Sequence, residues 1–342
     1  MDPIRASTFA PPIALGDHDH PPQAGAPAGF RPPGDPRVSD AAPTQGDCPP
    51  PIAGEAYDFD RLVQATVVAP ELFARNSAND VDEISPQDVS QGQISDCSLM
   101  ATLCALANTP QGRGVIRNSI VENKDSRGTV VSYSVTLFDR RPTPLGSVLS
   151  RANDLSRGLG DRAVDTFRTL SKVTVTIDAK YACGHADARP SESGTNEVWP
   201  LILEKAVAQI VGGYDILDKG SLSHRSMEML TGKPASFHPL IGGTLSTIVP
   251  GSFGPSDVAA AAASGRLVVL NTWATFVPAT PPGQAPPYGL ETGHAYAVIG
   301  IVDVGGTKCA SLQNPWGDKN PMPIPLAELP SFFAGVCTGS VD

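Results

Sequence analysis

Three short motifs carry a cysteine, a histidine and an asparagine at distant points of the chain, and they constrain its fold more than any other feature. A thiolate nucleophile needs an imidazole that holds and passes a proton, and an amide that orients that imidazole. We therefore expect the fold to bring the three side chains together. They are Cys97 within residues 91–99, His294 within residues 293–298 and Asn314 within residues 313–317.

The residues after Cys97 have the spacing of a helix. Apolar side chains recur at Leu99, Met100, Leu103 and Leu106. This period predicts a helix over 97–108 that begins at the cysteine.

A cysteine at a helix start is in a favourable place to ionise. The first turn presents unpaired N–H groups and the positive end of the helix dipole, and Asp96 or Ser95 could cap it. We expect pairing with His294 to lower the pKa of the Cys97 thiol by several units from its usual ~8.5.

The histidine and asparagine motifs read as a β-hairpin. Strand-favouring residues fill 294–302 and 308–313, and Gly305-Gly306 lies between them. Since His294 begins the first strand and Asn314 follows the second, both lie at the same end of the hairpin. The amide oxygen can then accept from the imidazole N–H and set its tautomer.

These motifs resemble those of the calpain family of papain-like cysteine proteases, which read Q-G-x-L-G-D-C-W-L, G-H-A-Y and N-P-W-G. The segment 175–178 is similar to a strand of that family, and 196–206 is similar to its N-E-x-W…L-L-E-K-A helix. Gly213-Tyr214 follows at the family's place, so the resemblance spans about 55–340.

The resemblance implies further roles near the three side chains. It assigns Gln91 to the oxyanion hole, with the main-chain N–H of Cys97 as the second donor. Gly92 would let the loop approach the reacting carbonyl closely. Trp316 would cover the contact between His294 and Asn314.

Two residues depart from the family pattern. Ser98 stands where the family has tryptophan, so we expect a more open wall beside Cys97. Ser95 replaces the glycine before Asp96. Neither change removes a catalytic atom, so they bear on efficiency and specificity.

The resemblance also raises calcium, which the sequence supports weakly. Residues 316–332 carry only two acids, Asp318 and Glu328, and no Asp-rich loop of EF-hand type occurs. The pairs Cys183 with His185 and His18 with His20 lack the further ligands that zinc requires. We expect no metal site and no required cofactor.

The chain divides into a tail and one catalytic domain. Residues 1–54 are rich in proline and poor in large apolar residues, which predicts disorder. Residues 55–342 are expected to form an α+β, papain-like, two-lobed domain with a substrate cleft between the lobes. The helical lobe, 55–235, would carry Cys97, and the antiparallel β lobe, 236–342, would carry His294 and Asn314.

Other periodic segments predict the remaining main elements of the domain. Helices are expected at 197–211 and 257–264. Strands are expected at 130–138, 173–178 and 267–271.

Charge and composition limit the partners. A net charge of −10 argues against nucleic acid, which needs a basic face. No run of about 18 apolar residues predicts a membrane span. Six cysteines without a disulfide pattern fit a reducing, intracellular compartment. We also expect the protein to be a monomer.

The opening residues, Met1 to Arg5, resemble the leader of type III secreted effectors of plant-associated bacteria. This resemblance would place the enzyme in the cytosol of a host cell.

The predicted function is that of a cysteine endopeptidase acting on a protein or peptide substrate through an acyl-enzyme. Two alternatives remain. The same side chains serve an acyltransferase or deamidase. A binding protein of the same fold with weak catalysis is the other, and Ser98 is the residue that favours it.

Overall fold

The computed structural model describes most of the predicted catalytic domain. The described residues are 64–65, 67, 69–76, 82–142, 168–182, 186, 188–190, 193–243, 245–274, 286–317 and 319–342. The tail 1–54, the pairs Cys183 with His185 and His18 with His20, and Asp318 lie outside them.

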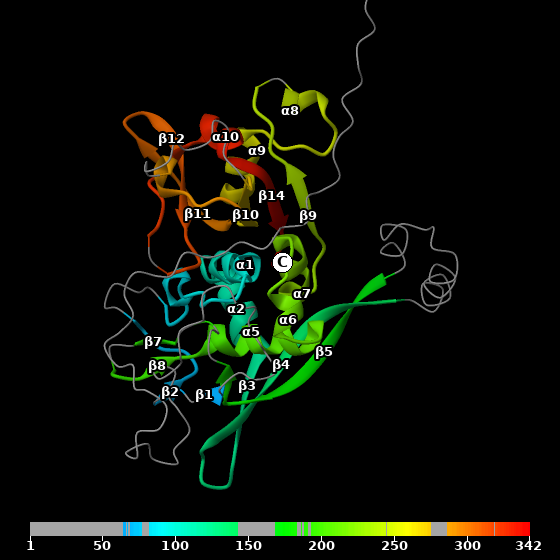
Figure 1. Cartoon of the computed structure of the whole chain (residues 1–342), viewed down its shortest axis with the longest axis vertical. Coiled ribbons are helices and arrows are strands. Elements are labelled where there is room, and N and C mark those ends of the chain that lie inside the picture. Colours follow the sequence, from blue (N-terminus) through cyan, green and yellow to red (C-terminus); the bar gives the residue numbers. More distant parts are fainter. Residues whose placement is uncertain are drawn as a thin grey trace, which may run out of the picture.

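The fold has two lobes that meet at one helix. Figure 1 shows α1 (Cys97–Ala107) in the middle, with a six-stranded antiparallel sheet above it and the other large helices of the first lobe below. The predicted α+β, papain-like, two-lobed architecture is therefore confirmed.

The first lobe combines helices with small sheets. A three-stranded antiparallel sheet in the order β3-β4-β5 packs against α5 and α7. Two smaller sheets pair β1 with β6 and order β2-β8-β7. The helices are α2 (Pro110–Ser119), α5 (Trp199–Val211), α6 (Tyr214–Leu217), α7 (Ser223–Thr231) and the 3-10 turn η3 (Pro86–Asp88). The strands are β1 (Gln64–Ala65), β2 (Pro70–Glu71), β3 (Ile120–Lys124), β4 (Val130–Pro142), β5 (Arg168–Asp178), β6 (Tyr181–Ala182), β7 (Arg189–Pro190) and β8 (Asn196–Glu197).

The second lobe is built on the six-stranded sheet, whose order is β13-β12-β11-β10-β14-β9. Helix α9 packs on β10 and β11. The strands are β9 (Ala235–Pro239), β10 (Leu267–Thr272), β11 (Ala295–Val304), β12 (Thr307–Gln313), β13 (Ile324–Pro325) and β14 (Phe333–Gly339). The helical turns are α8 (Leu245–Ile248), α9 (Pro255–Ala263), η4 (Pro287–Gly289), η5 (Leu326–Glu328) and α10 (Leu329–Phe332).

Helix α1 is buried on every side, although the sequence predicted one apolar face. All residues from Ser98 to Ala107 are buried. The helix contacts α2, α5 and α7 of its own lobe and β10 and β11 of the other. Small residues such as Ala101, Thr102 and Ala105 occupy the faces of α1 without large side chains, so the neighbouring elements can pack closely there. Burial on every side fixes the helix, and hence Cys97, between the lobes.

The predicted hairpin is confirmed. Strands β11 and β12 pair antiparallel, with Ala297 opposite Gln313 and Val304 opposite Thr307. A register shift lies between Val298 and Gly300. His294 therefore precedes the first strand and Asn314 follows the second at one end of the sheet.

The other predicted helices and strands are also found, within a few residues at their ends. Helices α5 and α9 and strands β4, β5 and β10 correspond to the expected segments. Strand β14 was not predicted, although it lies inside the sheet between β10 and β9. Its sequence, with Gly335 and Gly339 within seven residues, lacks the clear alternation that signals a strand.

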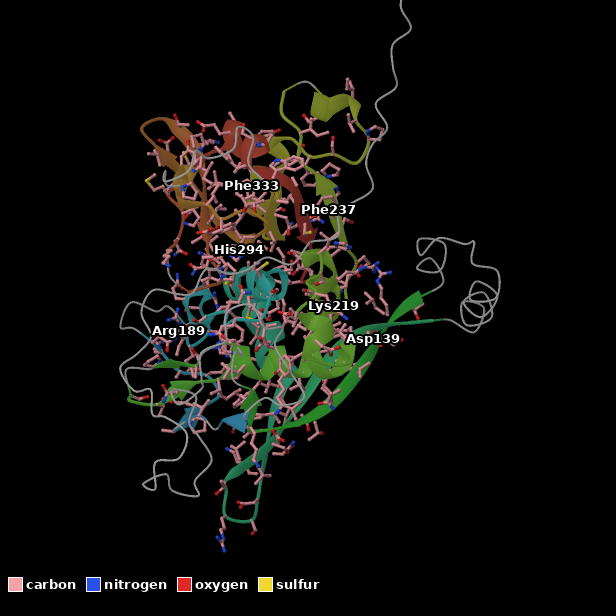
Figure 2. The ribbon with its side chains drawn as sticks, viewed as in Figure 1. Asp139, Arg189, Lys219, Phe237, His294 and Phe333 are labelled. Carbon is pink, nitrogen blue, oxygen red and sulfur yellow. The ribbon has the colours of Figure 1, made fainter. Side chains whose placement is uncertain are left out.

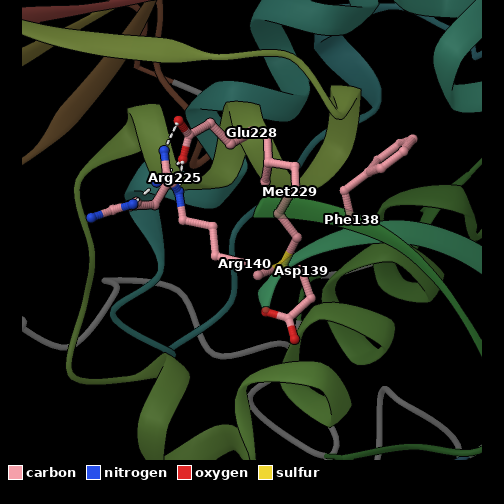
Figure 3. A pocket seen from close by; sticks show the side chains of 7 residues that line it. Phe138, Asp139, Arg140, Arg225, Glu228 and Met229 are labelled. Carbon is pink, nitrogen blue, oxygen red and sulfur yellow. Dashed lines mark hydrogen bonds and ion pairs between the residues drawn. The ribbon is translucent and has the colours of Figure 1, made fainter. Parts of the chain in front are cut away.

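An ion-pair cluster ties α7 to β4 away from the hairpin end. Figure 3 shows Arg140 and Arg225 converging on Glu228 in a pocket of about 280 Å³. Arg140 donates to the buried Glu228 carboxylate through Nε at 2.8 Å and through Nη2. Arg225 Nη1 lies 3.5 Å from the same carboxylate. None of the predicted site residues lines this pocket, and Arg140 and Arg225 both pair with Glu228.

No helix in the described part of the chain combines the length and the apolar character needed to cross a bilayer.

Candidate active site

Cys97 is the first residue of α1 and lies beside the start of β11. Its side chain is half-buried, and the main-chain N–H of Ala295 interacts with its thiol. Because Ala295 follows His294, the packing of α1 on β11 brings the cysteine and histidine motifs together. Figure 2 shows His294 at the level where the two lobes meet.

The surroundings of the thiol favour its protonated form. Desolvation by burial and the nearby Asp96 carboxyl raise the pKa of the Cys97 thiol to about 11. The N–H groups of Ala295 and Ser98 and the Ser98 hydroxyl act in the opposite direction. The sequence predicted a lowered pKa, and that prediction is wrong for this structure because desolvation outweighs the helix start.

The predicted side-chain cap of α1 is also absent. Asp96 is the N-cap residue, and its side chain makes no capping hydrogen bond. The main-chain carbonyl of Asp96 accepts from Leu99 N at 2.8 Å and from Met100 N at 3.1 Å. Ser95 N donates to Oδ1 of Asp218 at 2.8 Å. The Asp96 carboxyl instead meets the carboxyl of Glu204 on α5.

His294 and Asn314 are joined by a direct hydrogen bond. Nε2 of His294 lies 3.0 Å from Oδ1 of Asn314. Both side chains are buried, at 5 % and 1 % exposure.

The contacts of Asn314 decide which imidazole nitrogen holds the proton. Its Nδ2 donates to Lys319 O at 3.3 Å, and its Oδ1 accepts from Trp316 N at 3.1 Å. An oxygen so oriented can only accept, so Nε2 of His294 carries the hydrogen. In the neutral ring the basic nitrogen is therefore Nδ1.

Main-chain and ring contacts hold His294 in place. Its N–H donates to Thr272 Oγ1 at 2.8 Å, and its carbonyl accepts from Thr272 N at 2.9 Å. The Trp316 ring lies 4.7 Å from the imidazole, tilted by 44°, and the Tyr296 ring meets it edge-on at 4.9 Å. The imidazole is thus fixed on several sides, one of which is formed by the Trp316 ring.

Gln91 belongs to a loop that is anchored to the asparagine motif. Its N–H donates to Pro315 O at 2.8 Å, and its Nε2 donates to Ile94 O at 2.7 Å. An amide group has two N–H bonds, so Nε2 can donate a second time. The side chain is 2 % exposed, and its Oε1 is a buried acceptor with no hydrogen-bond partner among the described residues.

Glycine lets the two loops pass close together. A Cβ added to Gly317 would lie 2.9 Å from Val89 O, and its φ of 81° favours glycine. Gly92 is half-buried in the loop between Gln91 and Ile94. Gly317 therefore permits the approach that the Gln91 and Pro315 hydrogen bond needs.

Ser98 is buried, with 5 % of its surface exposed. Its hydroxyl interacts with the Cys97 sulfur and favours the thiolate. This serine therefore supplies a polar contact to the thiol where the family has an apolar ring.

A second carboxyl pair supports the loop before Gln91. Asn76 Nδ2 donates to Asp88 Oδ1 at 2.6 Å and to Glu197 Oε2 at 2.9 Å. Trp199 Nε1 donates to Asp88 at 3.2 Å, and Ala74 N donates to Glu197 at 3.0 Å. Burial raises the pKa of Asp88 to about 6, and burial with the Asp88 charge raises that of Glu197 to about 9.

Several supporting residues carry no signal in the sequence. Thr272 lies on β10, and the pairing of β10 with β11 brings its hydroxyl to the main chain of His294. Asn320 Oδ1 accepts from Asn314 N at 2.8 Å. The segment 196–206, which resembles the family helix, is the sequence signal that could have pointed to Glu197 and Glu204. In the structure both carboxyl groups are buried.

Among the described residues, no group of three or more His, Cys, Asp and Glu side chains gathers as a metal site. The Asp88 and Glu197 oxygens accept hydrogen bonds from N–H and O–H donors.

Comparison with known proteins identifies the family. The model of the calpain family of cysteine proteases matches residues 68–321, which is most of the chain. The chain therefore belongs to the calpain family of cysteine proteases.

Two relatives illustrate how distant the match is. The calpain-like protease palB/RIM13 of Aspergillus oryzae is 24 % identical over 268 residues, covering 74 % of this chain and 27 % of that protein. Calpain-A of Drosophila melanogaster is 24 % identical over 282 residues, covering 79 % and 29 %. The chain spans less than a third of the length of these curated relatives.

Proposed function

We propose that this chain is a cysteine endopeptidase in which Cys97 is the nucleophile, His294 the acid and base, and Asn314 the residue that orients the imidazole. The observation that carries the proposal is the buried 3.0 Å hydrogen bond between His294 Nε2 and Asn314 Oδ1. The Cys97 thiol lies close by, because it interacts with the main-chain N–H of Ala295, the residue after His294. This arrangement leaves Nδ1 as the basic nitrogen for proton transfer.

The reaction follows from these positions. Cys97 loses its proton to Nδ1 of His294 and attacks the peptide carbonyl, and His294 then gives the proton to the leaving amine. Water next attacks the acyl-enzyme while His294 takes its proton. Asn314 holds the ring throughout, and Gln91 Nε2 with the N–H of Cys97 would stabilise the oxyanion.

The raised pKa of Cys97 places one demand on this mechanism. With the thiol protonated at rest, His294 must accept its proton during attack rather than before substrate binds. Attack on the carbonyl together with proton transfer to Nδ1, while Asn314 holds the imidazole in place, meets this demand.

Labelling with an epoxide inhibitor of papain-like enzymes tests the proposal. The wild type, Cys97→Ala and His294→Ala are compared with and without calcium, and labelled peptides are identified by mass. Labelling confined to Cys97 and dependent on His294 supports the assignment, and its independence of calcium is expected because no cofactor is required. Absence of labelling under both conditions favours a binding protein of the same fold.

A peptide-bond assay separates proteolysis from the related chemistry on the same side chains. Chain scission of an unfolded protein substrate, absent in Cys97→Ala, supports the endopeptidase. A mass change from amide to acid without scission identifies a deamidase instead.

A further inference from the structure

Trp273 is a large apolar residue that lies exposed at the edge of the candidate active site. The chain has three tryptophans. Trp199 is fully buried and Trp316 packs on His294, whereas Trp273 is 43 % exposed. Exposed tryptophan rings are frequent among the residues that carry the energy of binding another chain. What Trp273 can bind therefore depends on where its ring lies.

Main-chain hydrogen bonds fix Trp273 beside the histidine motif. Thr272 N donates to His294 O at 2.9 Å, and Gly293 N donates to Trp273 O at 2.8 Å. Trp273 N donates to Phe332 O at 3.1 Å. Trp273 therefore lies opposite Gly293, the residue before His294, and the Cα atoms of such an antiparallel pair are about 4.5–5.5 Å apart.

The alternation of strand side chains directs the Trp273 ring toward the face of the sheet that packs on α1. Asn271 lies opposite Ala295 in the pairing of β10 with β11. Val269 and Ala295, on this face, belong to the core that also contains the apolar side chains of α1. Trp273 is two residues beyond Asn271, so its side chain leaves the sheet on the same face.

Helix α1 does not extend as far as Trp273. Its first residue, Cys97, lies at Ala295, and Asn108, which follows its last residue, donates through Nδ2 to Ile299 O at 3.1 Å. The helix thus runs along β11 from Ala295 toward Ile299. Trp273 lies beyond the Cys97 end of the helix, which explains why its ring is open to solvent beside the thiol.

The proposed reaction decides which part of a substrate meets this ring. The acyl part of the substrate stays bonded to Cys97, while His294 gives its proton to the leaving amine. The leaving peptide therefore begins at His294, next to the Trp273 and Gly293 pair. Gly293 has no side chain to cover the indole, so an apolar side chain of the leaving peptide can pack on it.

We propose that Trp273 is a specificity-determining residue whose ring contacts a large apolar side chain directly after the cleaved bond. The inference rests on the proposed function and deepens it, because it names the substrate class on the leaving side of the site.

Identification of cleavage products tests the proposal without a known substrate. A mixture of unfolded proteins is digested with the wild type, Trp273→Ala and Trp273→Phe, and the new N-termini are identified by mass spectrometry. Each new N-terminus is the residue that followed a cleaved bond. Thermal unfolding checks that each variant is folded.

We expect the wild type to favour phenylalanine, leucine and methionine over glycine and serine by about tenfold at the new N-termini, as for a hydrophobic subsite. Trp273→Ala should reduce this preference to about threefold or less, whereas Trp273→Phe keeps an aromatic ring and should retain most of it. The residues before the cleaved bonds should stay the same. A wild type without this preference, an unchanged preference in Trp273→Ala, or a change confined to the residue before the bond overturns the proposal.

A control variant removes an exposed apolar side chain elsewhere on the same sheet. Val304 is 53 % exposed and ends β11, at the far end of the strand from His294. Val304→Ala should keep the wild-type preference. A loss as large as that in Trp273→Ala would overturn a role specific to the indole.

Binding without cleavage separates this inference from the proposed function. Short peptides that begin with phenylalanine or glycine, and are otherwise identical, are titrated by calorimetry into Cys97→Ala and into the double variant Cys97→Ala, Trp273→Ala. We expect the phenylalanine peptide to bind Cys97→Ala about tenfold more tightly, and the difference to be lost in the double variant.

The two measurements distinguish the possible failures. The expected binding difference, without any cleavage by the wild type, overturns the proposed function alone. Cleavage whose preference is unaffected by Trp273→Ala overturns this inference alone. Equal binding of both peptides, without cleavage, overturns both.

Discussion

Asn314 accepts a hydrogen bond from Nε2 of His294 at 3.0 Å while main-chain groups on both sides hold its own amide. The amide is therefore a fixed acceptor, and the imidazole can rotate only if this hydrogen bond breaks. Orientation of this kind makes proton transfer between two side chains efficient.

Replacement of Asn314 should slow catalysis without removing the nucleophile. We expect Asn314→Ala to lower kcat/KM by about 10²-fold, because the ring loses its acceptor and its fixed direction. Asn314→Asp keeps an acceptor for Nε2 and should lose less. Equal losses in peptide hydrolysis by the two variants would contradict the orienting role.

Gln91 should matter to turnover and not to thiol chemistry. We expect Gln91→Ala to lower kcat by about 10²–10³-fold, as for loss of an oxyanion donor. Iodoacetamide reaction at Cys97 forms no oxyanion and should keep its rate. A parallel loss in both assays would indicate that the loop has rearranged and would contradict a donor role.

Ser98 should assist ionisation of the thiol. Its hydroxyl opposes the raised pKa of Cys97, so Ser98→Ala should raise that pKa further. The alkylation rate at pH 8 should then fall about threefold, as for a shift of half a unit. Ser98→Thr keeps the hydroxyl and serves as the control, which should retain the wild-type pH profile.

The Asp88 and Glu197 pair should make the protein less stable as pH rises. Their folded pKa values of about 6 and 9 lie above the ordinary 3.8 and 4.5. At a pH between the ordinary and the folded pKa of each group, the folded protein keeps a proton that the unfolded chain has released. The free energy of unfolding should therefore fall, by up to about 1.4 kcal/mol per pH unit for each proton held.

Urea unfolding at pH 5, 7 and 9 measures this dependence. Glu197→Gln removes the group with the higher pKa, so its stability should vary less with pH than that of the wild type. A wild-type protein that is more stable at pH 9 than at pH 5 would contradict this account.

The Glu228 cluster should stabilise the first lobe. Glu228→Ala removes a buried carboxylate and leaves Arg140 without its paired acceptor, so we expect a loss of about 3 kcal/mol in the free energy of unfolding. Arg225 is more exposed and lies farther from Glu228, so Arg225→Ala should cost well under half as much. Similar losses from both variants would contradict this order.

The main elements around the site could be predicted because their signals are local. The period after Cys97 predicts α1, and the two strand-favouring runs with Gly305-Gly306 between them predict the β11 and β12 hairpin. Each pattern lies within about 20 residues and is set by main-chain preference and side-chain alternation. The hairpin also determined that His294 and Asn314 lie at one end.

The electrostatics of the site could not be predicted in the same way. The sequence places Cys97 at a helix start, which favours a thiolate, but burial and Asp96 raise its pKa. Asp96 is a residue type that often caps a helix through its side chain. In the structure its carboxyl instead lies beside that of Glu204, on a helix more than 100 residues later in the chain. These effects depend on which groups surround an atom in three dimensions.

The sequence by itself thus determined the order of the candidate site residues and the local elements that carry them, because motif and period are properties of neighbouring residues. Only the tertiary structure decided the tautomer of His294, the hydrogen bond from Gln91 Nε2 to Ile94 O, and the effect of burial and of Asp96 on the pKa of Cys97. The physical reason is that hydrogen-bond partners and desolvation come from segments brought together by the packing of α1 between two lobes.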